Sequence, residues 1–537
     1  MNMSMNTIQL YDSTAMADLF LRLSQPYDST ALADLILRSS DHVEFYVLGA
    51  FLRYVSPTFR TMFALNTGQA VDDNEKKDGY PVVCVAEDSS TLRLLLDSIY
   101  PTAEERPLYD VGLFWKAAKA SQKYCMKIIE DKLRKRVFAS DLMKYYSLRM
   151  YVVATDLGWD DVAIAAARQT LQTPLESLLY VDELESISGA GFYRFLEYRF
   201  RCSKSPNPLI EGFTKFPSVV KPCSPTDADN VSDASAPFDS FAPADLVLRS
   251  SNLVDFFVSG TLIRRLSAVF KGMFPLPPEH EVKNGMPVVR VEESSEVLHC
   301  LLSVIHYDLD ELDMKDCQLY IKVVQAARKY KMTIIERRLH KQAANSPLTN
   351  SDPLRVYISA AALGWEELAK KVALNTFHEP LDKLTYVDEL RFITGADLYR
   401  LVKYRFQCVD AASSALESDP MFPKYGFGQW NGHFRSNNSW PPKTNYDSTN
   451  PSSAYTQLKV SPRGSTVSDI YSKHLESQLQ VVASENGKFE MSPSIFFNIV
   501  RCARDAEKNV EDVIAKVEFA KARSFRNIDW LKPPVRP

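Results

Sequence analysis

The sequence contains no apolar run that approaches the roughly 18 residues needed to span a membrane as a helix. Its opening residues, MNMSMNTIQL, also lack the basic and apolar regions of a secretory signal. We therefore expect an intracellular protein, cytoplasmic or nuclear, with no membrane partner.

The chain also lacks an excess of charge of either sign. Its 63 Lys and Arg residues and 67 Asp and Glu residues leave a net charge of −4, so no overall field attracts nucleic acid. The one basic cluster, at 132–136, ends a predicted helix, where positive charge complements the helix dipole. We expect no direct contact with nucleic acid.

Residues that could bind a metal are not grouped. No two of the eight cysteines lie at the two-to-four-residue spacing of a zinc site. Only Cys202 and Cys408 occupy equivalent places in the duplication described below, and none of the eight histidines does. We expect free thiols, as is usual in a reducing compartment, and no bound metal.

The motifs of common enzyme classes are missing as well. The sequence has no G-x-S-x-G, no P-loop, no H-E-x-x-H and no dinucleotide-binding glycine fingerprint. Gly189-Ala-Gly191 lies between helical stretches and is predicted to be a turn. We expect a protein that is not an enzyme and has no cofactor.

One pair of carboxylates occurs twice, at Asp182-Glu183 and at 388–389. Adjacent residues of a helix point about 100° apart, so the two groups cannot readily converge on one substrate. Helix capping, or a salt link to Arg194 or Arg400, is the interpretation that we favour.

What the sequence does contain is a long internal duplication. Residues 33–63 recur at 244–274 with 16 of 31 positions identical, and residues 79–202 then match 285–408 without a gap. The last 55 residues of that stretch keep 27 identities. A period near 200 residues exceeds the roughly 20–50 residues of a solenoid unit, so we predict two copies of a globular unit.

Apolar alternation and helical spacing predict the same order of elements in each copy. Pro57 lies within the first predicted helix and suggests a kink or a break, although the second copy has Ala268 there. In the first copy we predict strands at 35–38, 43–47 and 81–85, and helices at 50–63, 91–100 (capped by Ser89 and Ser90), 111–124 and 126–137.

Composition sets the predicted domain boundaries. Stretches rich in Pro, Ser and Asp are typical of linkers and disorder. We predict an N-terminal segment at 1–26, two α+β units at 27–139 and 238–344, all-helical extensions at 140–202 and 345–408, a linker at 203–237, a disordered segment at 409–465 and C-terminal helices at 466–525.

The last of those helices opens at Ser492-Pro493, a capping serine followed by a first-turn proline. It is either a partner-binding or coiled-coil segment or a cap on the second repeat. Its apolar stripe is Phe496, Val500, Ala503, Val510, Ile514 and Val517.

The N-terminal segment carries a shorter duplication. Residues 11–24 match residues 27–40 at 11 of 14 positions. Either this copy has no role, or it is a strand that pairs with an exposed sheet edge of this chain or of a partner.

Together these features resemble the BTB/POZ fold. The resemblance is strongest at residues 33–63, which end in Ser-Pro-Thr-Phe-Arg-Thr-Met-Phe, and at 117–133, AAKASQKYCMKIIEDKL. The second copy has these stretches less fully, at 267–274 and 323–339. The resemblance implies an α+β fold of two tandem BTB/POZ-like units, each with a helical extension, similar to BTB proteins of filamentous fungi.

The chain departs from the family just before the first helix. The family usually has a His-Lys pair there, whereas this chain has Leu48-Gly49, and residues 259–260 in the second copy, while Asp34 and Asp245 remain. Each aspartate therefore needs another polar partner or exposure to water, because burying an unpaired carboxylate is costly.

The resemblance implies a non-enzymatic scaffold or adaptor that binds proteins. BTB domains pair through the first strand and first helix, so the two units are expected to form an intramolecular pseudo-dimer or a homo-oligomer. The candidate interface residues, which are otherwise ordinary core, are Leu35, Leu37, Phe51, Val55, Leu246, Leu248, Leu262 and Leu266.

Two more specific roles follow from the resemblance. One is a substrate adaptor of a cullin-type ubiquitin ligase, with the extension at 140–202 where such adaptors extend their ligase contact, although no recognised substrate-binding domain follows. The alternative is an assembly module of a transcription or chromatin regulator.

Overall fold

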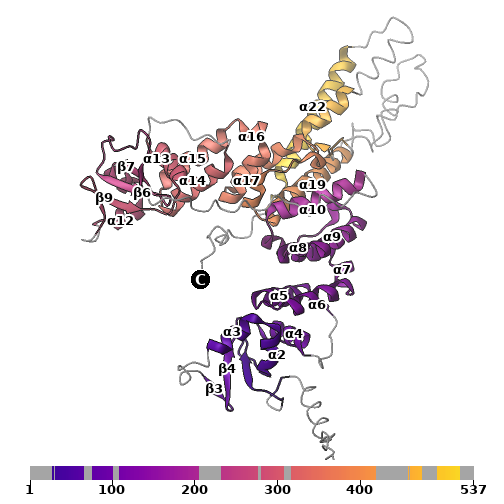
Figure 1. Ribbon diagram of the computed structural model, residues 1–537. Helices are drawn as coiled ribbons and strands as arrows, with labels where there is room; N and C mark the ends of the chain where they lie inside the picture. Colours follow the sequence, from indigo (N-terminus) through magenta and orange to yellow (C-terminus); the bar gives the residue numbers. More distant parts are fainter. Residues whose placement is uncertain are drawn as a thin grey trace, which may run out of the picture. The chain divides into compact units, whose positions relative to one another are not determined.

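The computed structural model describes residues 27–28, 31–65, 75–100, 108–204, 231–275, 280–306, 316–418, 457–458, 460–473 and 493–519 (Figure 1). They divide into two compact units, Met1–Ile187 and Ser188–Pro537. The duplicated strand motif at 11–24 lies outside the described residues.

The first unit begins with a small mixed sheet of strand order β2-β1-β4-β3. β1 pairs with β2 antiparallel and with β4 parallel, and its Leu35, Ile36 and Leu37 are buried. Its elements are β1 (Leu35–Arg38), β2 (Glu44–Val47), α2 (Gly49–Val55), α3 (Pro57–Leu65), β3 (Lys76–Lys77), β4 (Tyr80–Cys84), α4 (Ser89–Ile99), α5 (Val111–Lys123) and α6 (Lys127–Phe138).

The predicted helix at 50–63 is broken in both copies, and a serine accounts for the break. The Ser56 hydroxyl accepts the N–H of Phe59 at 3.0 Å and donates to the carbonyl of Tyr124 at 2.6 Å. In the second copy Ser267 makes the same two bonds although Ala268 follows it. The predicted break is confirmed, and its recurrence before Ala268 shows that the proline is not required for it.

The helix that follows β4 also begins differently from the prediction. Asp88, rather than Ser89 or Ser90, is the N-cap of α4, and its carboxylate accepts the N–H of Thr91 at 2.8 Å. The preference of Asp and Ser for N-caps is similar, so the sequence alone did not separate these neighbours.

The helical extension of the first repeat starts at α7 and is continuous with the α+β part. Trp115 on α5 donates from its indole to Asp156 on α8 at 2.7 Å. Its elements are α7 (Leu142–Tyr145), α8 (Ser147–Leu157), α9 (Asp160–Gln169), the 3₁₀ turns η1 (Thr170–Gln172), η2 (Leu175–Ser177) and η3 (Asp182–Ser186), and α10 (Gly189–Lys204).

The second repeat has the same element order. Its sheet order is β5-β7-β6-β9-β8, which is the order of the first sheet with one added strand. The elements are β5 (Ser232–Asp233), β6 (Leu246–Arg249), β7 (Val254–Val258), α11 (Gly260–Leu266), α12 (Ala268–Met273), β8 (Val282–Lys283), β9 (Met286–Arg290), α13 (Ser295–Ile305), α14 (Cys317–Lys329) and α15 (Thr333–Asn345).

The added strand corrects the predicted linker at 203–237. β5 pairs with β7 in parallel, and the carbonyl of Phe238 accepts the N–H of Phe257 at 3.0 Å. The edge of β7 supplies free backbone groups that a neighbouring segment can pair with, so the last residues of the predicted linker belong to the sheet.

The second extension and the C-terminal segment pack together. α19 continues to Ser418, into the segment predicted as disordered, because Val409, Ala412 and Leu416 are buried there. The elements are α16 (Leu348–Ser351), α17 (Pro353–Leu363), α18 (Glu366–Asn375), the 3₁₀ turns η5 (Thr376–His378), η6 (Leu381–Lys383) and η7 (Asp388–Phe392), α19 (Gly395–Ser418), a helix at 464–473 and α22 (Pro493–Lys516).

α22 packs against α19, which is the cap on the second repeat that the sequence left as one alternative. Among the described residues, no helix is both long and apolar enough to cross a membrane.

The last helix of the first repeat lies beside the last helix of the second (Figure 1). The N–H of Gly189, the first residue of α10, donates to the carbonyl of Ile393 at 2.7 Å, and the Tyr193 hydroxyl donates to the carbonyl of Leu384 at 2.8 Å. A Cβ at Gly189 would lie 2.7 Å from Ile393 Cγ1. The glycine therefore permits the close approach, and the two repeats are joined through their terminal helices.

Removing the serine at the helix break should destabilise the first repeat. We expect Ser56→Ala to lower the free energy of unfolding by about 1–3 kcal/mol, because it removes a cap and leaves the Tyr124 carbonyl without its buried donor. Pro57→Ala is the control, with a change within about 0.5 kcal/mol. Urea denaturation of both variants measures this, and equal losses would contradict it.

A methyl group at Gly189 should weaken the contact between the terminal helices. We expect Gly189→Ala to cost about 1–3 kcal/mol, since its Cβ meets Ile393 and the carbonyl of Leu390. At Gly272 a Cβ meets no atom within 4 Å, so Gly272→Ala should not destabilise. Hydrogen exchange should rise at 384–393 in the first variant only.

Candidate interaction surfaces

The strand residues predicted to form a pairing interface lie in the core of their own repeats. Leu35 and Leu37 are 5% and 0% exposed, and Leu246 and Leu248 are each 1% exposed. Their side chains are therefore not part of the surface of either repeat. β1 and β6 each lie between two neighbouring strands, so their backbone groups are also paired within their own sheets.

The helix residues of the predicted interface are more accessible. Val55 is buried, whereas Phe51, Leu262 and Leu266 are partly exposed. The Phe51 ring contacts that of Tyr100, with centroids 5.0 Å apart. The interface stays a prediction, and it is the helices α2 and α11 that offer side chains for it.

The predicted interface did not include Tyr54, a strongly exposed residue of that helix face. Tyr54 on α2 is 73% exposed, and the equivalent residue of α11, Arg265, is also exposed. An arginine and a tyrosine attract each other when the guanidinium lies over the ring. The sequence could have indicated Tyr54, because it follows Phe51 by three residues and therefore falls on the same side of the helix.

The opening aspartates have found the polar partner that the sequence required. Asp34 accepts the backbone N–H of Gly49, at the start of α2, and Asp245 accepts that of Gly260, at the start of α11. Both aspartates are exposed, so each carboxylate is hydrated as well as bonded. A negative group is favourable at a helix N-terminus.

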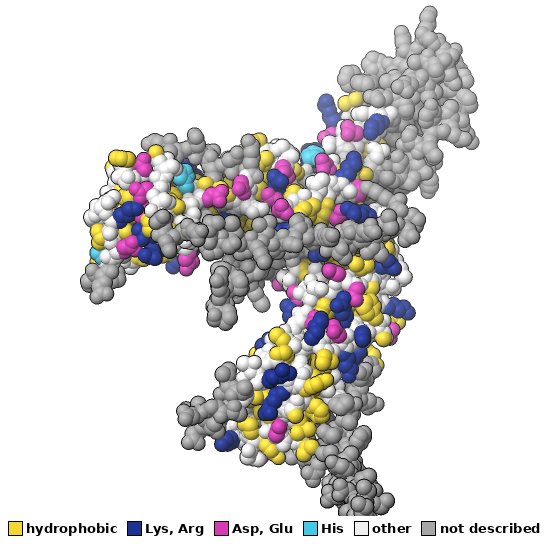
Figure 2. All heavy atoms as spheres, in the orientation of Figure 1, with side chains coloured by type: hydrophobic (Ala, Val, Ile, Leu, Met, Phe, Trp, Pro, Cys, Tyr) yellow, Lys and Arg dark blue, Asp and Glu magenta, His cyan; other side chains and the backbone are white. Residues whose placement is uncertain are grey.

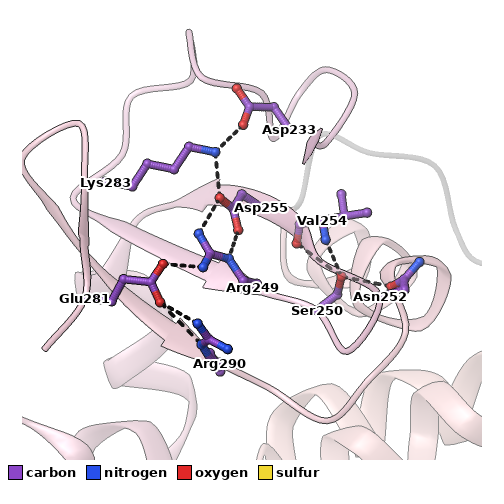
Figure 3. Close-up of polar contacts among 9 residues, drawn as sticks. All are labelled: Asp233, Arg249, Ser250, Asn252, Val254, Asp255, Glu281, Lys283 and Arg290. Carbon is purple, nitrogen blue, oxygen red and sulfur yellow. Dashed lines mark hydrogen bonds and ion pairs between the residues drawn. The ribbon is translucent and has the colours of Figure 1, made fainter. Parts of the chain in front are cut away.

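The second sheet holds a charged network (Figure 3). Arg249 on β6 donates to Asp255 on β7 at 2.6 and 3.0 Å and also bonds Glu281. Lys283 on β8 joins Asp255 to Asp233 of β5, with 2.6 Å to each. Four strands are thus tied by side chains as well as by their backbones.

The first sheet has the same arrangement with fewer members. Arg38 bonds Glu44 at 2.8 Å and Glu75 at 2.7 Å, and Lys77 bonds Glu44 at 2.6 Å. Glu44 is 17% exposed, whereas its counterpart Asp255 is fully buried. The network of the second sheet therefore lies in a less polar environment, where each charge depends more on its partners.

The pKa of Asp255 reflects this dependence. Burial acts to raise it, but the hydrogen bonds from Arg249 and Lys283 outweigh burial and lower the pKa below its ordinary value. The pKa of Lys283 is raised, because its bonds to Asp233 and Asp255 outweigh the opposing effect of burial. The charged forms of both groups are favoured in the fold.

The duplicated carboxylate pair is structural. Glu183 in η3 bonds Arg149 on α8, with Nε at 3.0 Å from one oxygen, and Glu389 lies 3.7 Å from Arg355. Arg400, predicted as a partner, pairs with Glu366 instead. The predicted salt link is present for Glu183 and Glu389, and their partners Arg149 and Arg355 lie in the first turns of α8 and α17.

The surface carries no large field of one sign on the face that Figure 2 shows, where basic and acidic side chains are interspersed. Apolar side chains gather in this view on the part of the first repeat that contains α2 and α4. In the described ranges, no group of three or more His, Cys, Asp or Glu side chains is placed to hold a metal.

A comparison with known protein families identifies the first repeat. The family model described as BTB/POZ domain matches residues 23–136, a range that contains the four-stranded sheet and the helices α2 to α5. These residues therefore form a BTB/POZ domain, a class of domain that mediates protein–protein interaction. No curated protein matches the chain.

Breaking the network at its buried carboxylate should destabilise the second sheet. We expect Asp255→Asn to cost about 2–4 kcal/mol at pH 7, because Arg249 and Lys283 lose a buried partner. Glu44→Gln, at the more exposed equivalent site, is the control and should cost less. Urea denaturation at pH 7 measures both.

The loss of stability caused by Asp255→Asn should depend on pH. Since the folded-state pKa of Asp255 is lowered, its contribution is complete above the ordinary pKa near 4 and disappears as the pH falls through the lower folded value. The difference between wild type and Asp255→Asn should therefore narrow from pH 7 to pH 3. A constant difference would contradict this origin.

Proposed function

We propose that the chain is a non-enzymatic interaction scaffold or adaptor built on two BTB-like units. The BTB/POZ match at 23–136 supports the first unit. The second unit is supported by its strand order, which is that of the first sheet with one added strand, by the same helix break at Ser267 and by a similar network of charged residues. These features repeat the inner architecture of the first unit, while the exposed residues of the two differ.

The proposal rests mainly on the exposure of aromatic side chains on the outer face of α2. Phe51 is partly exposed and Tyr54 is 73% exposed, on a domain whose class binds proteins. Tyrosine offers a large contact area at low entropic cost and is enriched at the energetic centres of interfaces. We propose that this face pairs with α11, where Leu262 and Arg265 occupy the equivalent positions, in the same chain or in a second copy.

A photo-cross-linking amino acid in place of Tyr54 tests the pairing in the full chain. We expect adducts to residues 260–269, and the mass of the adduct shows whether they lie within one 60.8 kDa chain or between two. The control is the same substitution at Tyr145, which is 67% exposed on α7. Adducts only outside residues 260–269 would contradict the pairing.

Charged variants test the same face by a second route. Phe51→Glu and Leu262→Glu should each abolish the adducts, because a carboxylate cannot be buried at an apolar contact without large cost. Val43→Glu, at an apolar residue that is 44% exposed on the same unit, should leave them unchanged. Persistence of the adducts in both helix variants would contradict the assignment.

The narrower role of a cullin-ligase adaptor has one supporting feature, the helical extension that directly follows α6. A pull-down of the full chain tests it, and the absence of a cullin would reject the adaptor role while leaving the scaffold proposal untouched.

A further inference from the structure

The C-terminal segment covers one side of the second extension. α22 packs against α19, and its buried residues recur at helical spacing, whereas most others in its last four turns are exposed. These buried residues are Cys502, Ala503, Ala506, Val510 and Ile514. α22 is therefore an amphipathic helix held in place by one face.

The helix at 464–473 crosses α22 at very short distance. The N–H of Gly464 donates to a carboxylate oxygen of Glu511 at 2.8 Å. A Cβ at Gly464 would lie 2.5 Å from the carbonyl oxygen of Glu507, so only glycine fits. The two C-terminal helices thus form one element that covers the extension together.

Two arginines, one buried and one half-buried, hold this element by donating hydrogen bonds to backbone carbonyl groups. Arg405 on α19 is 4% exposed and donates to the carbonyls of Glu379, at 2.6 Å, and Val460. Arg463 donates to the carbonyl of Leu374, near the end of α18. Burial lowers the pKa of Arg405 to about 10 and lowers that of Arg463 too. Their acceptors are neutral groups, which compensate a buried cation less well than a carboxylate does.

Phe519, just after α22, packs among two tyrosine rings and a third arginine. We call this group, Tyr357, Tyr404 and Arg400, the box. Its ring centroid lies 4.9 Å from that of Tyr404, 6.4 Å from that of Tyr357 and 4.4 Å from the guanidinium carbon of Arg400. The side chain of Arg400 is 7% exposed and bonds Glu366 through Nη1, while its Nε and Nη2 form no hydrogen bond with any residue that the structure describes. The box therefore contains a buried cation with unused donors.

The first extension differs from the second where the cover lies. Leu374 and Phe377 of the second extension correspond to Arg168 and Leu171 of the first. Phe377 is fully buried, whereas Leu171 is 39% exposed. At these two positions the second repeat therefore has a more apolar or a larger apolar side chain than the first.

We propose that the surface formed by α19, α17, the end of α18 and the box around Arg400 is a docking site for a partner's amphipathic helix that is followed by an aromatic residue. The protein's own α22, followed by Phe519, occupies this site in cis. The aromatic ring is stabilised over the guanidinium of Arg400.

The protein's own C-terminal segment lowers the apparent affinity of the site for a partner. An attached segment acts at an effective concentration of roughly millimolar, so a free partner binds only weakly until the cis contact is loosened. The site is separate from α2 and α11, so it does not depend on the pairing proposed for those helices.

A labelled synthetic peptide of residues 493–519 tests the proposal by fluorescence anisotropy with the full chain. We expect weak binding to wild type and at least tenfold tighter binding to Phe519→Ala, in which the cis occupant is weakened. Phe241→Ala, at a phenylalanine that is 94% exposed in the second repeat, is the matched control and should bind as wild type does. The peptide with Phe519→Ala should bind neither protein.

Equal affinity of the peptide for wild type and Phe519→Ala would overturn the proposal. Hydrogen exchange provides the second measurement: in Phe519→Ala, exchange should rise at 500–516 while α17 and α18 stay protected. Unchanged exchange at 500–516 would show a permanent cap and would also overturn the proposal.

Discussion

The buried hydroxyl between the first two helices of each repeat is the contact on which the α+β part depends. Ser56 caps α3 and reaches the carbonyl of Tyr124 at the end of α5, and the Tyr124 ring stacks on Phe59 at 4.7 Å. The Tyr124 hydroxyl donates to Glu87, beyond β4, at 2.6 Å. One side chain thus joins helices and sheet, and Ser267 and Tyr330 repeat the arrangement.

The duplication has kept the interior and changed the outside. The strand networks, the helix break and the opening aspartates recur in both repeats. Tyr54 and Arg265, which are both exposed, differ at equivalent positions. Interior positions are constrained by close packing, and surface positions are freer to acquire a partner. The two repeats are therefore one architecture with two sets of contacts.

The sequence predicted the local elements well, because alternation and helical spacing are local properties. The strand at 35–38 and the helix at 111–124 agree with β1 and α5 to within a residue. It could not choose among distant partners: Glu183 binds Arg149, and Arg400 binds Glu366. It also missed β5 and the contact of α10 with α19, since both depend on surfaces that exist only after folding.

The packing of α10 against α19 has a consequence for folding during protein synthesis. α10 carries Phe192, Tyr193, Phe195 and Leu196, all buried, yet α19 begins 206 residues later in the chain. A ribosome adds about 5–20 residues per second, so the partner of α10 emerges roughly 10–40 s after it. During that interval the aromatic helix α10 has emerged without the neighbour that covers its apolar face, and exposed apolar surface of this kind favours aggregation.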